Sequence, residues 1–200
     1  RIGEQLMALT KVTGGLLGNL PTGTSNVAVG DTALDSIASG ATDNVAIGSA
    51  AGTAVTTGTQ NTLIGGLAGD ALTDSDYNVA VGYGALTSDT LGARNVAIGQ
   101  EALASQNFTS ATNSYNTAVG MNAGRLVTTG IQNTIIGGLA GDAITTANYT
   151  VAVGYNAAGA TTTGASNSVL GRHALKSNTT GSQNVAIGRD ALEANTTASN

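Results

Sequence analysis

The chain has one histidine, His173, which is the residue best suited by type to acid–base or metal chemistry. A catalytic histidine requires a nucleophile and an orienting carboxylate, and its close neighbours Arg172 and Lys176 provide neither. His173 is therefore interpreted as a variable turn position. If three copies met at the axis of a trimer, they could together bind an anion or a metal ion.

Two other segments have the spacing of known sites. Asp70, Asp74 and Asp76 alternate as calcium ligands do, but the related segment that begins at Asp142 keeps only one of the three carboxylates. GGLAGD, at 65–70 and again in the related segment, is similar to a phosphate-binding loop but lacks the lysine and a following helix pattern. We therefore predict no catalytic, cofactor-binding or metal-binding residue and no enzymatic activity.

Composition narrows the class of protein further. The 200 residues are 41% hydrophobic and only 10% charged, with 29 glycines and no cysteine, which is unlike a disordered chain and unlike an ordinary enzyme. The chain has only seven lysines and arginines and a net charge of -5, which argues against a nucleic-acid partner. No run of eighteen apolar residues is present, so membrane insertion is not expected.

A five-residue block of the form NVAIG recurs ten times and sets the organisation of the chain. The blocks are 17 residues apart except for one spacing of 18 and one of 21, and they begin at residues 26, 44, 61, 78, 95, 116, 133, 150, 167 and 184. We expect residues 26–200 to form one repeat domain and residues 1–25 to form a cap or linker.

Three positions of the repeat are nearly constant: an opening Asn, a closing Gly, and an Ala three residues after the Gly. We expect them to form structural ladders, represented by Asn44, Asn61, Asn78 and Asn95, by Gly48, Gly65, Gly82 and Gly99, and by Ala51, Ala68, Ala85 and Ala102. Stacked asparagine amides can bond to the copies above and below.

A short Val- and Ile-rich block followed by Gly and turn residues is typical of a strand. The spacing predicts an all-β fold, a parallel β-solenoid of about ten coils, with one strand in the block and a weaker one after the constant Ala. We expect the third block residue, as in Ala28, Ala46 and Ala80, to face outward. One coil buries too little apolar surface to fold alone, and small apolar outer columns invite packing against another chain, so the sequence predicts a symmetric oligomer.

The segment LKSNTTGSQNVAIG, at 175–188, resembles the Asn- and Gly-rich repeats of bacteriophage tail fibres. It is also similar to the head repeats of YadA-like trimeric adhesins, whose units are shorter, which favours the tail-fibre resemblance. The resemblance implies a homotrimeric left-handed β-roll, located in a virion tail fibre, that presents a surface to a host glycan or outer-membrane protein. Alternatives are the head of a bacterial trimeric autotransporter or a homopolymeric filament on the cell surface, and a glycan depolymerase spike.

Receptor contact is expected where the stack is irregular or aromatic. The longest spacing includes Gln106, Asn107 and Phe108, while Tyr83 and Tyr155 each follow a block glycine. A tyrosine ring can bind a sugar through its face and its hydroxyl. Stacking of these rings between coils is the structural alternative. Threonines in the turns leave ice binding as a more distant alternative.

Overall fold

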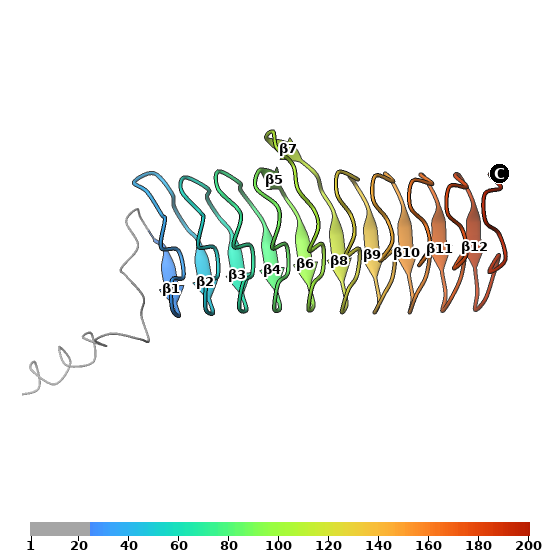
Figure 1. The fold of residues 1–200 in the computed structure, drawn as a ribbon, viewed down its shortest axis with the longest axis horizontal. Helices are drawn as coiled ribbons and strands as arrows, with labels where there is room; N and C mark the ends of the chain where they lie inside the picture. Colours follow the sequence, from blue (N-terminus) through green and yellow to red (C-terminus); the bar gives the residue numbers. More distant parts are fainter. Residues whose placement is uncertain (1–24) are drawn as a thin grey trace, which may run out of the picture.

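The computed structural model describes residues 25–200, which wind into a rod of stacked coils (Figure 1). The predicted cap or linker at residues 1–25 lies outside the described residues except for its last one. Each block forms one strand, and the ten strands make a single parallel sheet. They are β1 (Val27–Val29), β2 (Val45–Ile47), β3 (Thr62–Ile64), β4 (Val79–Val81), β6 (Val96–Ile98), β8 (Thr117–Val119), β9 (Thr134–Ile136), β10 (Val151–Val153), β11 (Ser168–Leu170) and β12 (Val185–Ile187). The predicted all-β parallel solenoid with seventeen-residue coils is confirmed.

The strands are paired in the register of the sequence repeat. Val45 is opposite Thr62 and Ile47 is opposite Ile64, and each further pair of coils repeats this alignment. The sheet is therefore built from like positions of successive repeats. Two further short strands, β5 (Gly92–Ala93) and β7 (Thr112–Asn113), pair only with each other and form a separate two-stranded sheet.

The opening asparagines lie on the inside of the rod as a hydrogen-bonded ladder. Asn61 donates from its backbone nitrogen to Oδ1 of Asn44 at 2.9 Å, and its side-chain nitrogen donates to the carbonyl of Ser75 at 2.7 Å. Asn78 and Asn95 continue the series. Each amide thereby joins neighbouring coils and occupies a buried position at no cost in unpaired polar groups.

The prediction that the third block residue faces outward is wrong. Ala46 and the equivalent Ala80 are fully buried, whereas Ile47 is 39% exposed. On most coils the strand therefore turns its small Ala into the core and its larger Val and Ile side chains outward, and only Leu63, Ile135 and Val169 place a larger residue at the inward position. Both faces of the strand are apolar, so alternation alone could not assign them.

The predicted second strand is also absent within residues 25–200. After the block glycine the backbone enters the left-handed region twice, for instance at Ala50 and Gly52 with φ of 57° and 58°, and this prevents an extended segment. The coils are still joined along this wall, because Gly52 donates to the carbonyl of Ala68 and Ala54 to that of Asp70, both at 3.0 Å.

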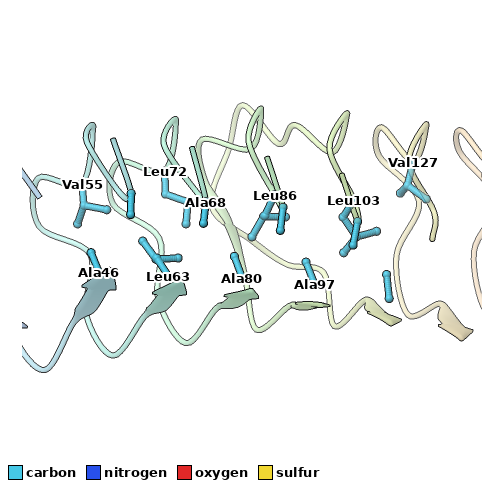
Figure 2. Close-up of a cluster of buried hydrophobic side chains, with 14 of the residues drawn as sticks. Ala46, Val55, Leu63, Ala68, Leu72, Ala80, Leu86, Ala97, Leu103 and Val127 are labelled. Carbon is cyan, nitrogen blue, oxygen red and sulfur yellow. The ribbon is translucent and has the colours of Figure 1, made fainter. Parts of the chain in front are cut away.

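The core between the two walls is a single layer of small and medium side chains (Figure 2). Where the strand carries Leu63 in place of Ala, the opposite wall carries Gly52 and Gly69. A Cβ atom on either glycine would lie 2.7–2.8 Å from a methyl carbon of Leu63. Large and small residues therefore alternate across the core, which keeps the thickness of the rod constant.

Candidate functional site

The outward-facing second and fourth residues of the ten blocks form a continuous surface that we call the outer sheet face. Except for three threonines and one serine it is made of Val, Ile and Leu, and it carries no charge. The exposed fraction is 42% for Val151 and 51% for Leu170. An uncovered apolar sheet of this kind is unusual for a monomeric protein in water, so it is the main candidate for an interaction surface.

Exposed aromatic residues border the outer sheet face on the side that precedes each block. Arg94 is stacked between two tyrosines, with its guanidinium carbon 4.4 Å from the ring centre of Tyr77 and 6.0 Å from that of Tyr115. All three occupy the same repeat position on successive coils, and both rings are nearly half exposed. This row supplies flat apolar area together with one positive charge.

Tyr83 and Tyr155 border the other side of the face and are 57% and 51% exposed. A Cβ on Gly66 would lie 3.4 Å from Tyr83, and one on Gly138 would lie 3.7 Å from Tyr155, so each ring lies beside a glycine of the preceding coil. The two rings therefore stack on the rod and still present an open surface. This position is compatible both with sugar binding and with structural stacking between coils.

The longest spacing between blocks is anchored by a buried carboxylate, Asp89. Its Oδ1 accepts hydrogen bonds from the backbone nitrogens of Gly92 and Phe108, both at 3.0 Å, and its Oδ2 accepts one from Nε2 of Gln106 at 2.6 Å. Gln106 also accepts from the side chain of Asn116 at 2.8 Å. Gln106 and Phe108 are thus buried structural residues, and the expectation that their side chains face a receptor is not supported by their position.

The extra residues emerge just after this anchor. Leu91 donates to the carbonyl of Phe108, seventeen residues later, but Gly92 is paired with Thr112, twenty residues later. Thr109, Ser110 and Ala111 are all exposed, and this loop projects from the rod beside β7 (Figure 1). Together with exposed Asn107, this tip is the accessible part of the insertion.

The acidic and glycine-rich segments have structural roles in the stack. Asp74 and Asp76 accept hydrogen bonds from Thr57 and Thr59 of the preceding coil at 2.6 and 2.7 Å, whereas Asp70 accepts one from Thr87 of the following coil at 2.5 Å. These carboxylates point to different partners and do not converge on one point. In the related segment, burial raises the pKa of Asp142, which the guanidinium of Arg125 and two backbone hydrogen bonds partly offset.

His173 lies in the turn after β11, where φ is 57°. Its Nδ1 atom is 3.6 Å from Oδ1 of Asp190 on the next coil, and its ring centre is 5.8 Å from that of Tyr155 on the coil before. The sequence interpretation missed this contact, although a shift of seventeen residues from His173 leads directly to Asp190.

A hydroxyl ladder in the turns was also not anticipated as a bonded feature. Thr128, Thr145 and Thr162 each donate from Oγ1 to the backbone carbonyl of the threonine on the next coil, at 3.0–3.1 Å. These hydroxyls are used within the rod. The threonines that follow them, such as Thr129 and Thr146, are exposed.

No protein-family model, no curated protein and no solved structure matches this chain. Within residues 25–200 there is also no helix long and apolar enough to cross a membrane.

Proposed function

We propose that the chain is a shaft and host-attachment segment of a homotrimeric fibre, of the kind found in bacteriophage tails, with a structural and adhesive role and no catalytic one. The observation that carries the proposal is the outer sheet face, a long uncharged apolar strip on an elongated rod. A surface of this kind favours partners that run along the whole length of the rod.

The dimensions suit such a role. Ten strands at about 4.8 Å spacing give a rod roughly 48 Å long. From one aromatic border to the other, with both tyrosine positions included, the surface spans seven residues, or roughly 20 Å at about 3.3 Å per residue, so it covers roughly 1,000 Å². Stable interfaces bury about 800 Å² on each partner, which the outer sheet face can supply together with its two aromatic borders.

The partner proposed for this face is the chain itself. Three rods that turn their outer sheet faces toward a common axis would cover the apolar strip on every copy and leave the turns and the insertion exposed. The number three and a left-handed coil come from the resemblance to tail-fibre and adhesin repeats, whose units are trimeric. A closed ring of identical subunits also avoids open-ended aggregation through the strip.

Attachment to the host is assigned to the tip of the insertion and its exposed neighbours. Thr109 and Ser110 present hydroxyl groups on a loop that stands away from the stack. The exposed Asn107 adds an amide on the rod at the base of this loop, where its backbone nitrogen donates to Thr128 and its Oδ1 accepts from Thr90. Such groups can bond to the hydroxyls of a surface glycan or to the loops of an outer-membrane protein. Asp89 and Gln106 hold the base of the loop, so its position on the rod is fixed.

Light scattering on the purified chain tests the proposed assembly. A mass three times the chain mass of 19.5 kDa is expected. If the folded chain remains a monomer at concentrations high enough for a stable complex to form, both the proposed trimer and the proposed shaft role are refuted.

Glycan-array binding tests the attachment role. We expect Thr109→Gly combined with Ser110→Gly to weaken binding, because the tip loses two hydroxyl groups while its anchor stays intact. Thr146→Gly, which removes a hydroxyl from an exposed turn elsewhere, is the matched control. Equal binding by the tip variant and the control would remove the loop from the proposal.

A further inference from the structure

His173, Asp190 and Glu193 form a cluster across the last two coils of the rod. One potential ligand atom from each lies within 4.8 Å of the other two, and this is the only such group of three among residues 25–200. We propose that the cluster binds a divalent transition-metal ion such as Zn²⁺ or Ni²⁺. The site goes beyond the proposed shaft function and does not depend on it.

The chemistry of the three side chains suits these ions. Zn²⁺ binds imidazole nitrogen at about 2.0–2.1 Å and carboxylate oxygen at about 2.0–2.2 Å. In a tetrahedral site the ligand atoms would therefore be roughly 3.4 Å apart. The 3.6 Å between His173 and Asp190 is already close to this value. Glu193 is partly exposed and its ligand atom lies within 4.8 Å of the other two, so only a small movement of its carboxylate is required, and water can fill the fourth position.

Imidazole selects the kind of ion. Oxygen-only sites favour Mg²⁺ and Ca²⁺, whereas a histidine ligand shifts the preference to Zn²⁺, Ni²⁺ or Cu²⁺. Tyr155 packs 5.8 Å from His173 between ring centres and limits how the imidazole can turn. A ligand that is held in orientation before the ion arrives binds it more tightly.

Two basic side chains partly neutralise the cluster. The ammonium of Lys176 is 3.7 Å from Oε1 of Glu193, and Nε of Arg189 is 2.9 Å from Oδ2 of Asp190. Each contact involves one oxygen of its carboxylate, and Oδ1 of Asp190 is the atom that faces His173. Lys176 competes directly with an incoming ion for Glu193, so its removal should strengthen binding.

The repeat supplies matched variants. Asn122 and Asn156 occupy the position equivalent to His173 with φ of 58° and 54°, so His173→Asn places a residue that this backbone already accepts. Glu101 is a carboxylate at the same repeat position on a distant coil, so Glu101→Gln is the control for loss of an acidic group outside the cluster.

Calorimetric titration of the untagged chain with ZnCl₂ and NiCl₂ is the test, and one ion per chain is expected. Loss of an outer-shell partner typically costs about 10- to 100-fold in metal affinity, so His173→Asn and Glu193→Gln, which each remove a direct ligand, should both weaken binding at least about tenfold. Lys176→Gln should bind more tightly than the natural sequence, and Glu101→Gln should bind equally. Because the chain has a single histidine, its ring signals in NMR spectra report Zn²⁺ at this site alone.

The proposal fails if Zn²⁺ produces no saturable binding, if it binds no more tightly than Mg²⁺, or if His173→Asn retains the affinity of the natural sequence. Circular dichroism of each variant establishes that the rod is still folded. Metal binding is measured separately from mass, so the outcome is independent of whether the chain forms a trimer.

Discussion

Oδ1 of Asn44 accepts two hydrogen bonds from Asn61 on the next coil, one from its backbone nitrogen at 2.9 Å and one from its side-chain nitrogen at 3.0 Å. The same pair of bonds to the preceding asparagine is made by Asn44, Asn95, Asn133 and Asn184. Asn78 and Asn116 keep only the backbone bond, because their side-chain nitrogens donate to other partners. The asparagine ladder itself is interrupted at Thr150, whose backbone nitrogen donates to Asn133 at 3.0 Å but whose side chain has no carbonyl to offer Asn167.

Reciprocal substitutions at Asn61 and Thr150 test the energetic value of this ladder. Asn61→Thr should lower the free energy of unfolding by about 1–3 kcal/mol, because buried partners of the lost amide are left unpaired. Thr150→Asn should raise it by about 0.5–1.5 kcal/mol, the usual net value of an added hydrogen bond. Chemical denaturation followed by circular dichroism measures both. A neutral Asn61→Thr variant would show that stacking, and not the amide ladder, stabilises the coils.

A second prediction concerns the glycine that closes each block. A Cβ on Gly82 would lie 2.5 Å from the carbonyl oxygen of Gly99, whereas one on Gly188 would meet nothing within 4 Å. Both residues have positive φ, 135° and 116°. Gly188→Ala should therefore cost only backbone strain, about 1–3 kcal/mol, and Gly82→Ala should cost a further 1–3 kcal/mol or so for the steric overlap.

Thermal unfolding of the two glycine variants, recorded side by side, measures this difference. The midpoint of Gly82→Ala should lie clearly below that of Gly188→Ala. Equal midpoints would mean that neighbouring coils can separate slightly to admit a methyl group.

Much of the fold could be predicted from the sequence because the repeat itself is the fold. The spacing of Asn44, Asn61 and Asn78 gave the coil length and the parallel register, since only in-register stacking places identical residues over one another. Which face of the strand is turned toward the core could not be predicted, because Ala46 on one face and Ile47 on the other are both apolar. The second strand is missing because the backbone at Ala50 is left-handed, and an alanine does not indicate that conformation in a sequence.

Less of the candidate sites could be predicted from the sequence. Phe108 is the only phenylalanine and lies in the irregular spacing, which suggested exposure, but Asp89 draws that segment into the rod. The contact of His173 with Asp190 joins residues on successive coils, so it becomes visible only when the seventeen-residue register is applied to charged residues as well as to the block.

A third prediction concerns pH. Burial holds the pKa of Asp142 above its ordinary value in the folded chain. At pH values between the unfolded and folded pKa values, the folded state binds more protons than the unfolded state. The contribution of this group to stability therefore falls as pH rises through that range. Asp142→Asn removes the titration, and we expect the variant to gain stability relative to the natural sequence between acidic and neutral pH.

The gain should be near zero at pH values below both pKa values and reach a plateau above them, as measured by urea denaturation across the pH range. Asp70→Asn, which changes the equivalent residue of the related segment, leaves Asp142 in place and should not reproduce that gain. A gain that is equal at all pH values would attribute the effect to packing and not to ionisation.

The last prediction concerns the outer sheet face. Ile136 lies in β9 near the middle of this surface and is 38% exposed, so Ile136→Lys should leave the coil folded while placing a charge in any contact that covers the face. A charge buried without a partner costs several kcal/mol, which corresponds to a loss of association of at least about tenfold.

Thr146→Lys adds the same charge to an exposed turn and serves as the control. Light scattering over a dilution series should show Ile136→Lys dissociating to 19.5 kDa chains at concentrations where Thr146→Lys remains associated. If both variants keep the same mass on dilution, the copies are joined through another surface and the outer sheet face is not the interface.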